Sequence, residues 1–336
     1  MNPIKVPTEK KKMAILPPIA APQDLSAAEV SATARELIAN VEKVIVGKHE
    51  AVTLAVAVWL AEGHLLIEDV PGVAKTMLAR AMAQSAGCTF KRIQCTPDLL
   101  PSDVLGEPYV DSSSGRTEFR FGPIFSQFVL VDEINRATPR TQAALLEAMG
   151  EAMVTEGIVS YRLQKPFMVV ATQNPIEQEG TFLLPEAQKD RFLMRMSLGY
   201  PSLADERQMV ERFQLRHPID TLQPVTTPDR IVRCQEAVRK VTLPPAVSDY
   251  ILKIVRATRE HPALRLGSSP RGSLGLFRSA QAMCAIEGTD TVSATQVKAL
   301  AEKVLAHRFI IKKESQSCHA NANEVVAEIL QQTPMP

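Results

Sequence analysis

The spacing of apolar residues in the first part of the chain alternates between two periods. Residues 26–63 have the three- and four-residue spacing of amphipathic helices, and a short apolar run follows at 65–69. Comparable runs, separated for the most part by helical spacing, recur at 90–94, 128–132, 167–172 and 194–198. Strands that alternate with helices in this way form a parallel sheet covered by helices. The pattern therefore predicts an α/β domain.

The pattern changes after a polar stretch at 201–224, which we interpret as a linker. Beyond it the spacing is helical throughout. Thr227 and Ser269, each followed by proline, are typical helix N-caps, and Ser293 begins a capping box. The sequence therefore predicts a small all-helical second domain over 225–311.

The two ends of the chain are expected to lie outside these domains. Residues 1–26 contain five prolines and a lysine cluster, with few apolar side chains to offset the entropy of ordering them, so we expect a mobile arm. Residues 312–336 are polar and are predicted to form a loosely held tail. The α/β domain then spans 27–200.

Composition argues against several classes of protein. The 336 residues include 38 basic and 37 acidic side chains, which does not favour a nucleic-acid or anionic membrane surface. The five cysteines are scattered, which argues against a zinc cluster and a disulfide framework. The longest apolar stretch, at 51–61, is too short to span a bilayer, and prolines at 17 and 18 cut short a signal-like start. A soluble, cytoplasmic protein without membrane insertion is expected.

The turn after the first strand resembles a phosphate-binding loop. It runs from Asp69 through Gly72 to Ala74, Lys75 and Thr76, and it lacks two glycines of the usual pattern because Asp69 and Ala74 replace them. Backbone amides at the start of the next helix could still face phosphates, with Lys75 as a point charge and Thr76 as a magnesium ligand. The alternative is an ordinary turn with a surface lysine.

A second element favours the nucleotide interpretation. The apolar run at 128–132 ends in adjacent acids, where Asp132 could order Mg²⁺ through water and Glu133 could polarise a water that attacks a phosphate. An acidic turn after a strand is common by itself. Because both elements close buried strands, they are expected to meet at one edge of a parallel sheet.

Two further polar residues follow later strands. Asn174 could orient the attacking water, although Asn-Pro is also a common turn sequence. Arg191 precedes the last short apolar run, where a surface salt bridge is the alternative interpretation.

With these residues assembled, the chain resembles the MoxR family of AAA+ ATPases over about residues 26–311. The matching segments are Val70-Pro-Gly-Val-Ala-Lys-Thr76, Gly122-Pro-Ile-Phe125, Val131-Asp-Glu-Ile-Asn-Arg-Ala137, Thr141-Gln-Ala-Ala-Leu-Leu-Glu147, Ala171-Thr-Gln-Asn-Pro175, Glu179-Gly-Thr181, Asp190-Arg-Phe192 and Ser269-Pro-Arg271. The resemblance implies an AAA+ P-loop αβα core with a five-stranded parallel sheet, followed by a small helical lid domain. It also implies that ATP and Mg²⁺ are the cofactors.

The resemblance implies a role for each matching residue. Asn174 would be sensor 1, Arg191 the arginine finger, and Arg271 sensor 2, which touches the γ-phosphate from the second domain. Lys75 and Thr76 would contact phosphate and magnesium, with Asp132 and Glu133 as the Walker B pair. The remaining nucleotide contacts would be Val46 and Gly47 near the adenine, and Pro71, Gly72, Val73, Ala74 and Met77 in the loop.

The resemblance also suggests how such a protein works. Relatives form rings, so the resemblance implies a homo-oligomeric ring, expected to be a hexamer, that remodels or matures protein complexes as a chaperone-like motor. A partner with a von Willebrand A domain is implied. Hairpins expected at 106–122 and 152–163 would face the pore or pack on their own domain. The rival functions are a nucleic-acid motor, for which no basic domain is visible, and an ATP-binding switch without turnover.

Overall fold

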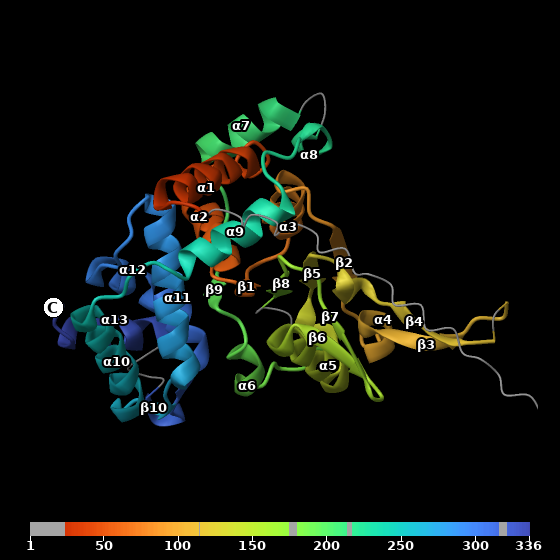
Figure 1. Cartoon of the computed structure of the whole chain (residues 1–336). Helices are drawn as coiled ribbons and strands as arrows, with labels where there is room; N and C mark the ends of the chain where they lie inside the picture. The colour runs from red at the N-terminus through yellow and green to blue at the C-terminus, as the bar shows by residue number, and fades with distance from the viewer. Residues whose placement is uncertain (1–23, 114, 175–179, 214–216, 316–320) are drawn as a thin grey trace, which may run out of the picture.

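A five-stranded parallel sheet forms the centre of the first part of the chain (Figure 1). The computed structural model describes residues 24–113, 115–174, 180–213, 217–315 and 321–336. The strand order is β2-β5-β8-β1-β9. The strands are β1 (Leu65–Glu68), β2 (Phe90–Gln94), β5 (Phe128–Asp132), β8 (Met168–Gln173) and β9 (Met194–Met196). The predicted sheet is confirmed, whereas the predicted arm at 1–26 lies almost wholly outside the described residues.

Helices cover both faces of this sheet. They are α1 (Ala27–Val41), α2 (His49–Leu60) and α3 (Lys75–Ser85) on one face and α5 (Pro139–Glu151) on the other. Alternation along each strand divides the apolar side chains between the faces. Leu65 and Ile67 belong to the buried cluster shared with α1, α2 and α3, whereas Leu66 belongs to the cluster shared with α5. Burial on both faces explains why the strands appear as continuous apolar runs.

The second part of the chain is helical. Its helices are α9 (Pro228–Val238), α10 (Pro245–Glu260), α11 (Pro270–Glu287) and α12 (Ala294–Leu305). The predicted N-caps at Thr227 and Ser269 and the capping box at Ser293 are confirmed. A short antiparallel ribbon of β10 (Leu264–Leu266) and β11 (Ile310–Ile311) accompanies the helices. Leu276 of α11 lies in the same buried cluster as Leu37 of α1, so one apolar core joins the two parts.

The prediction of a loose tail at 312–336 is wrong for its last section. Residues 322–332 form α13 (Ala322–Gln332), which packs against α10 and α12. Val325, Val326 and Ile329 are buried on one face of this helix. Their spacing is that of an amphipathic helix, which the polar composition of the segment concealed.

The predicted linker at 201–224 contains two helices. They are α7 (Leu203–Phe213), none of whose residues is buried, and α8 (Pro218–Thr221), which buries Ile219. The other short helices are α4 (Pro101–Leu105) and α6 (Glu186–Lys189). None of the helices in the described ranges is both long and apolar enough to cross a membrane.

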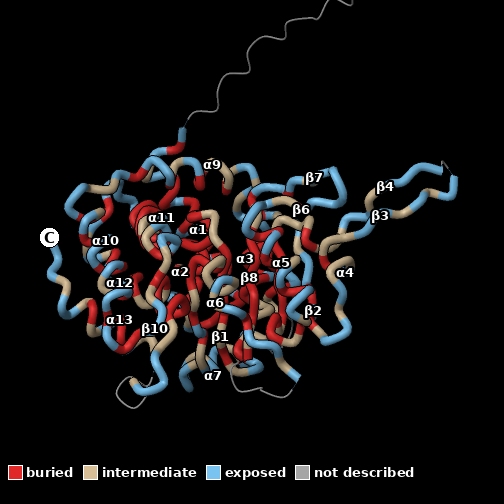
Figure 2. Tube along the Cα trace, turned by 90° about the horizontal axis from the view of Figure 1, so that it is seen from below, coloured by how far each residue is buried: buried red, intermediate tan, exposed pale blue. Residues whose placement is uncertain are grey.

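Both predicted hairpins are present. The strands β3 (Gly106–Val110) and β4 (Thr117–Phe121) form the first, and β6 (Met153–Glu156) and β7 (Val159–Arg162) form the second. The first hairpin extends from the body of the molecule and is largely exposed (Figure 2). The ring of Phe119, in the middle of β4, stacks on that of Tyr161 in β7 with centroids 4.5 Å apart. The two hairpins therefore contact each other.

Candidate functional site

The turn between β1 and α3 keeps the shape of a phosphate loop. Gly72 and Ala74 both adopt left-handed backbone conformations, with φ of 85° and 61°. For a residue with a Cβ this conformation costs about 1–2 kcal/mol, so the surrounding structure must stabilise Ala74 where glycine would be unstrained. α3 then begins at Lys75, and its N-terminus is directed at the loop, an arrangement that favours an anion.

Asp69, which replaces the other glycine, anchors the loop. Its Oδ2 accepts hydrogen bonds from Oγ of Ser197 at 3.0 Å and from the amides of Leu198 and Gly199 at 2.6 and 2.7 Å. Its Oδ1 accepts one from the amide of Val70 at 2.9 Å. Burial alone would raise the pKa of Asp69, but these hydrogen bonds outweigh it and lower the pKa. In the sequence, Asp69 departs from the usual glycine of a phosphate loop. In the structure, its carboxylate hydrogen-bonds the loop to the segment after β9.

A cleft of about 320 Å³ separates this loop from the ends of β5 and β8. It is lined by Pro71, Gly72, Ala74, Lys75, Thr76, Met77, Asp132, Glu133, Thr172 and Asn174. The Nζ of Lys75 donates to the backbone oxygen of Asp69 at 2.7 Å, which holds the ammonium group at the loop. Val73 differs from its neighbours because its side chain is buried in the core. Parallel strands bring these segments together because their carboxyl ends share one edge of the sheet.

Asp132 uses both carboxylate oxygens. Its Oδ1 accepts a hydrogen bond from the hydroxyl of Thr172 at 2.5 Å, and its Oδ2 forms an ion pair with Arg92 of β2 at 2.7 Å. The Thr172 oxygen in turn accepts from the amide of Glu133 at 2.9 Å. Sequence reasoning missed Arg92 and Thr172. Pairing of β5 with both β2 and β8 brings them beside Asp132, and only the strand order reveals this.

Glu133 follows Asp132 in a left-handed conformation, with φ of 56°. Its Oε2 accepts a hydrogen bond from Nε2 of Gln94 at 3.0 Å and forms an ion pair with Arg136 at 3.3 Å. The carboxylate is therefore held at the end of β5, beside the cleft that contains Lys75.

Asn174 lies beyond the end of β8 and lines the same cleft. It is buried, as is Thr172 two residues earlier. The two-residue period of a strand directs both side chains to one side, so a polar pair at this spacing is the signal that would have identified Thr172.

Val46 and Gly47 precede α2. Val46 is buried, and Gly47 has φ of 73°. A Cβ at Gly47 would lie 2.1 Å from Cγ of Asp205, so a larger residue would have to displace that side chain and adopt a strained φ. A cavity of about 270 Å³ at Gly47 is also lined by Ser197, which hydrogen-bonds to Asp69 of the phosphate loop. The cavity thus adjoins the loop, and adenine contact stays a prediction.

Arg191 lies at the opposite edge of the sheet from the phosphate loop. β1 and β9 are parallel, with Leu65 beside Met194. Lys75 follows β1, whereas Arg191 precedes β9. Its NH1 donates to the backbone oxygen of Ala187 at 3.2 Å, while its buried Nε has no hydrogen-bond partner within the described part of the chain.

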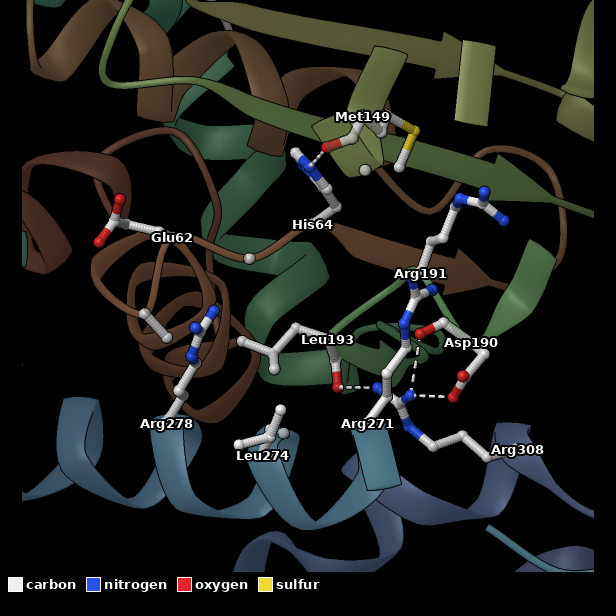
Figure 3. Close-up of a pocket in the computed structure, with 14 residues that line it drawn as sticks. Glu62, His64, Met149, Asp190, Arg191, Leu193, Arg271, Leu274, Arg278 and Arg308 are labelled. Atoms are coloured by element: carbon white, nitrogen blue, oxygen red, sulfur yellow. Dashed lines mark hydrogen bonds and ion pairs between the residues drawn. The ribbon is translucent and has the colours of Figure 1, made fainter. Parts of the chain in front are cut away.

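Arg271 was expected at the γ-phosphate, and the structure places it elsewhere. It lines a second cavity, of about 260 Å³, together with Arg191 and Arg278 (Figure 3). Among the described residues, those lining the cleft around Lys75 do not include Arg271. The reason is that α11 begins at the far edge of the sheet, where Ser269 hydrogen-bonds to Asp190. The expectation therefore does not hold for a nucleotide bound in the same chain.

The second cavity is rich in positive charge. Arg191, Arg271 and Arg278 form no ion pair with any acid in the described ranges. Glu62 also lines the cavity, but its carboxylate pairs with Lys165 and with another arginine. A cavity wall with several unpaired guanidinium groups is suited to an anion supplied from outside the chain.

His64 also lines this cavity and connects three segments of the chain. One ring nitrogen hydrogen-bonds to the backbone oxygen of Met149 at 3.1 Å, and the other accepts from the amide of Val169 at 3.1 Å. Burial lowers the pKa of His64 to about 4, against a smaller opposing effect of the Met149 contact. The histidine is therefore neutral and structural at neutral pH.

Acidification should destabilise the protein through this histidine. In the unfolded chain His64 has a pKa of about 6.5, whereas in the folded chain it stays neutral down to about pH 4. Between these pH values the unfolded state binds one more proton than the folded state, so the free energy of unfolding should fall by about 3 kcal/mol as the pH falls from 6.5 to 4. Urea unfolding at a series of pH values measures this. His64→Gln should flatten the curve, and replacing His307, whose pKa burial also lowers, should flatten it further. An unchanged slope in His64→Gln would contradict the assignment.

Comparison with known proteins agrees with this geometry. Residues 64–194 match the ATPase family associated with various cellular activities (AAA), and residues 256–329 match the AAA lid domain. Protein YeaC of Bacillus subtilis is 44% identical over 89% of this chain and 93% of its own length. Chaperone MoxR1 of Mycobacterium tuberculosis is 38% identical over 92% of this chain and 84% of its own length.

A crystal structure of a protein from Cytophaga hutchinsonii has the same fold. Its TM-score is 0.86 at 35% identity, and the match covers 92% of this chain and 97% of that one. Three findings indicate the same family. Two domains match, the phosphate loop and the acid pair line one cleft, and the relatives align over most of their length. The chain belongs to the MoxR family of AAA+ ATPases.

Proposed function

We propose that the protein hydrolyses ATP at the cleft between the phosphate loop and β5, and uses this reaction as a chaperone-like motor. The observation that carries the proposal is the convergence of Lys75, Thr76, Asp132 and Glu133 on that cleft from two separate segments. A lysine and a helix N-terminus on one side and two carboxylates on the other suit a phosphate chain with a bound divalent cation.

The residues have separate roles in this proposal. Lys75 neutralises the terminal phosphates, and Asn174 orients the attacking water while Glu133 polarises it. The hydroxyl of Thr76 and the carboxylate of Asp132 are hard oxygen donors, which fits Mg²⁺. When bound, Mg²⁺ neutralises charge on the phosphate oxygens.

We further propose that Arg191 and Arg271 act on the nucleotide of a neighbouring subunit in a homo-oligomeric ring, which we expect to be hexameric. Two facts support this. Both arginines line the second cavity, at the edge of the sheet away from Lys75. Neither has an acidic partner among the described residues. A guanidinium supplied by a neighbour stabilises charge on the transferred phosphoryl group. Each active site would then be shared.

The rate of ATP hydrolysis per subunit tests this arrangement. A shared site requires assembly, so phosphate release per subunit should rise with protein concentration and level off once assembly is complete. Sedimentation of the same samples identifies the assembled fraction. A rate per subunit that is constant across the assembly range would refute the shared site.

The chaperone-like role is supported by the relative named Chaperone MoxR1 and by the exposed first hairpin, which could reach another protein. A partner with a von Willebrand A domain is part of this proposal. Glu133→Gln should bind ATP without turnover and so retain its client. Tagged Glu133→Gln with ATP should therefore recover proteins that Lys75→Ala does not, and identical recoveries would contradict the role.

Arg92 should compete with Mg²⁺ for Asp132, because its guanidinium already pairs with Oδ2 of that carboxylate. Arg92→Ala should therefore lower the Mg²⁺ concentration needed for half-saturation about two- to fivefold, since the Arg92 side chain is half exposed and its ion pair is screened by solvent. Titration calorimetry of Mg²⁺ into protein with a non-hydrolysable ATP analogue measures the change. Lys91→Ala removes a charge from the same strand and should leave the titration unchanged. An equal shift in both variants would mean that Arg92 acts only through net charge.

A further inference from the structure

Asp190 lines the second cavity beside Arg191 and Arg271 (Figure 3). Asp190 immediately precedes Arg191, and its Oδ1 forms an ion pair with Arg308 (Figure 3). Its Oδ2 accepts a hydrogen bond from Ser269 at the start of α11, so the two oxygens bind two different helical elements of the second part of the chain. We propose that Asp190 is a positioning residue that fixes Arg191 and Arg271 relative to each other, so that both reach one nucleotide of the next subunit. This inference rests on the proposed shared site.

The first contact of Asp190 is with Arg308. The side chain of Arg308 is 2% exposed, and its NH1 forms an ion pair with Oδ1 of Asp190. The same guanidinium donates to the backbone oxygens of Asp190 at 2.9 Å and of Phe192 at 2.7 Å. These two residues flank Arg191. Arg308 therefore holds the backbone on both sides of Arg191 against the end of α12.

The second contact of Asp190 leads to Arg271. The hydroxyl of Ser269 donates to Oδ2 of Asp190 at 2.8 Å and accepts from the amide of Arg271 at 3.1 Å. Ser269 is the N-cap of α11, so its orientation sets the first turn from which Arg271 projects. One carboxylate thus determines the positions of both arginines, through Arg308 on one side and Ser269 on the other.

This arrangement differs from simple charge neutralisation. A carboxylate that only compensated buried Arg308 would need one oxygen, whereas here the second oxygen binds the cap of the helix that carries Arg271. The site requires both guanidinium groups at one phosphate, and a displacement of about 1 Å can lower a rate about 100-fold. Loss of the carboxylate should therefore affect turnover more than nucleotide binding.

The test uses Asp190→Asn in the full-length chain. ATP affinity should stay near wild type, because Lys75 lies at the other edge of the sheet, while kcat should fall about 10- to 100-fold. Glu186→Gln is the matched control. It removes an acid from the same segment, one whose only ion-pair partner among the described residues is Lys189 of its own helix, and it should leave kcat unchanged. An Asp190→Asn variant with wild-type kcat would overturn the inference.

Mixed assemblies separate positioning from general instability. In rings of Asp190→Asn and Glu133→Gln subunits, some sites combine an intact Glu133 with intact arginines from the neighbour, so turnover should return. In rings of Asp190→Asn and Arg191→Ala subunits it should not, because neither subunit supplies competent arginines. Ser269→Ala keeps the Asp190–Arg308 pair and should show the same pattern with a smaller loss.

The outcomes distinguish this inference from the proposed function. Two mixtures are compared, each with Glu133→Gln as one partner. If the mixture with Arg191→Ala regains turnover but the mixture with Asp190→Asn does not, Asp190 contributes only to folding and the inference is wrong. If Arg191→Ala with Glu133→Gln stays inactive in assembled rings, the shared site itself fails, and the inference fails with it.

Discussion

Replacement of Arg191 by alanine should leave ATP affinity near wild type and lower the rate of hydrolysis about 10³- to 10⁵-fold. The guanidinium lies at the edge of the sheet opposite to Lys75, so it contributes nothing to binding within its own chain. It stabilises charge that develops on the phosphoryl group of the neighbouring site, which affects only turnover. Calorimetry with a non-hydrolysable ATP analogue, beside phosphate release, measures both quantities.

The control for this variant is Arg207→Ala. Arg207 is an exposed arginine of α7, so its loss removes the same charge from the surface without touching the second cavity. It should hydrolyse ATP at the wild-type rate. If Arg191→Ala also did so, Arg191 would be a structural residue and the assignment would be wrong.

Lys75 and Glu133 should separate binding from turnover. Lys75→Ala removes the cation held at the phosphate loop and should abolish measurable ATP binding. Glu133→Gln keeps the size and the hydrogen-bonding capacity of the side chain but cannot accept a proton, so binding should persist while turnover falls about 10²- to 10⁴-fold. Calorimetry and phosphate release on the same samples test the pair. Undiminished hydrolysis in Glu133→Gln would exclude this residue from catalysis.

Local patterns predicted most of the fold because each depends on neighbouring residues. The apolar runs that became β1, β5 and β8 are buried on both faces, which makes them continuous in sequence. The N-cap at Ser269 is equally local, because its hydroxyl binds an amide two residues away. The convergence of Lys75 and Asp132 followed from a general property of parallel sheets.

The features that sequence reasoning missed depend on strand order and on packing between distant segments. Nothing near Arg92 indicates that it pairs with Asp132, because the contact exists only through the β2–β5 pairing. The placement of Arg271 depends on where α11 docks, which Asp190 and Ser269 determine across a long sequence separation. Motif spacing identifies the residue type that a reaction needs, but not which nucleotide that residue faces.

The central claim is that each site combines the cleft of one subunit with Arg191 of the next, and mixing two inactive variants tests it most directly. Arg191→Ala subunits retain Glu133, and Glu133→Gln subunits retain Arg191, so a mixed ring contains interfaces with both. Phosphate release should be near zero for each variant alone and should return on mixing, in proportion to the mixed rings detected by native mass spectrometry. Mixed rings that form and remain inactive would contradict the claim.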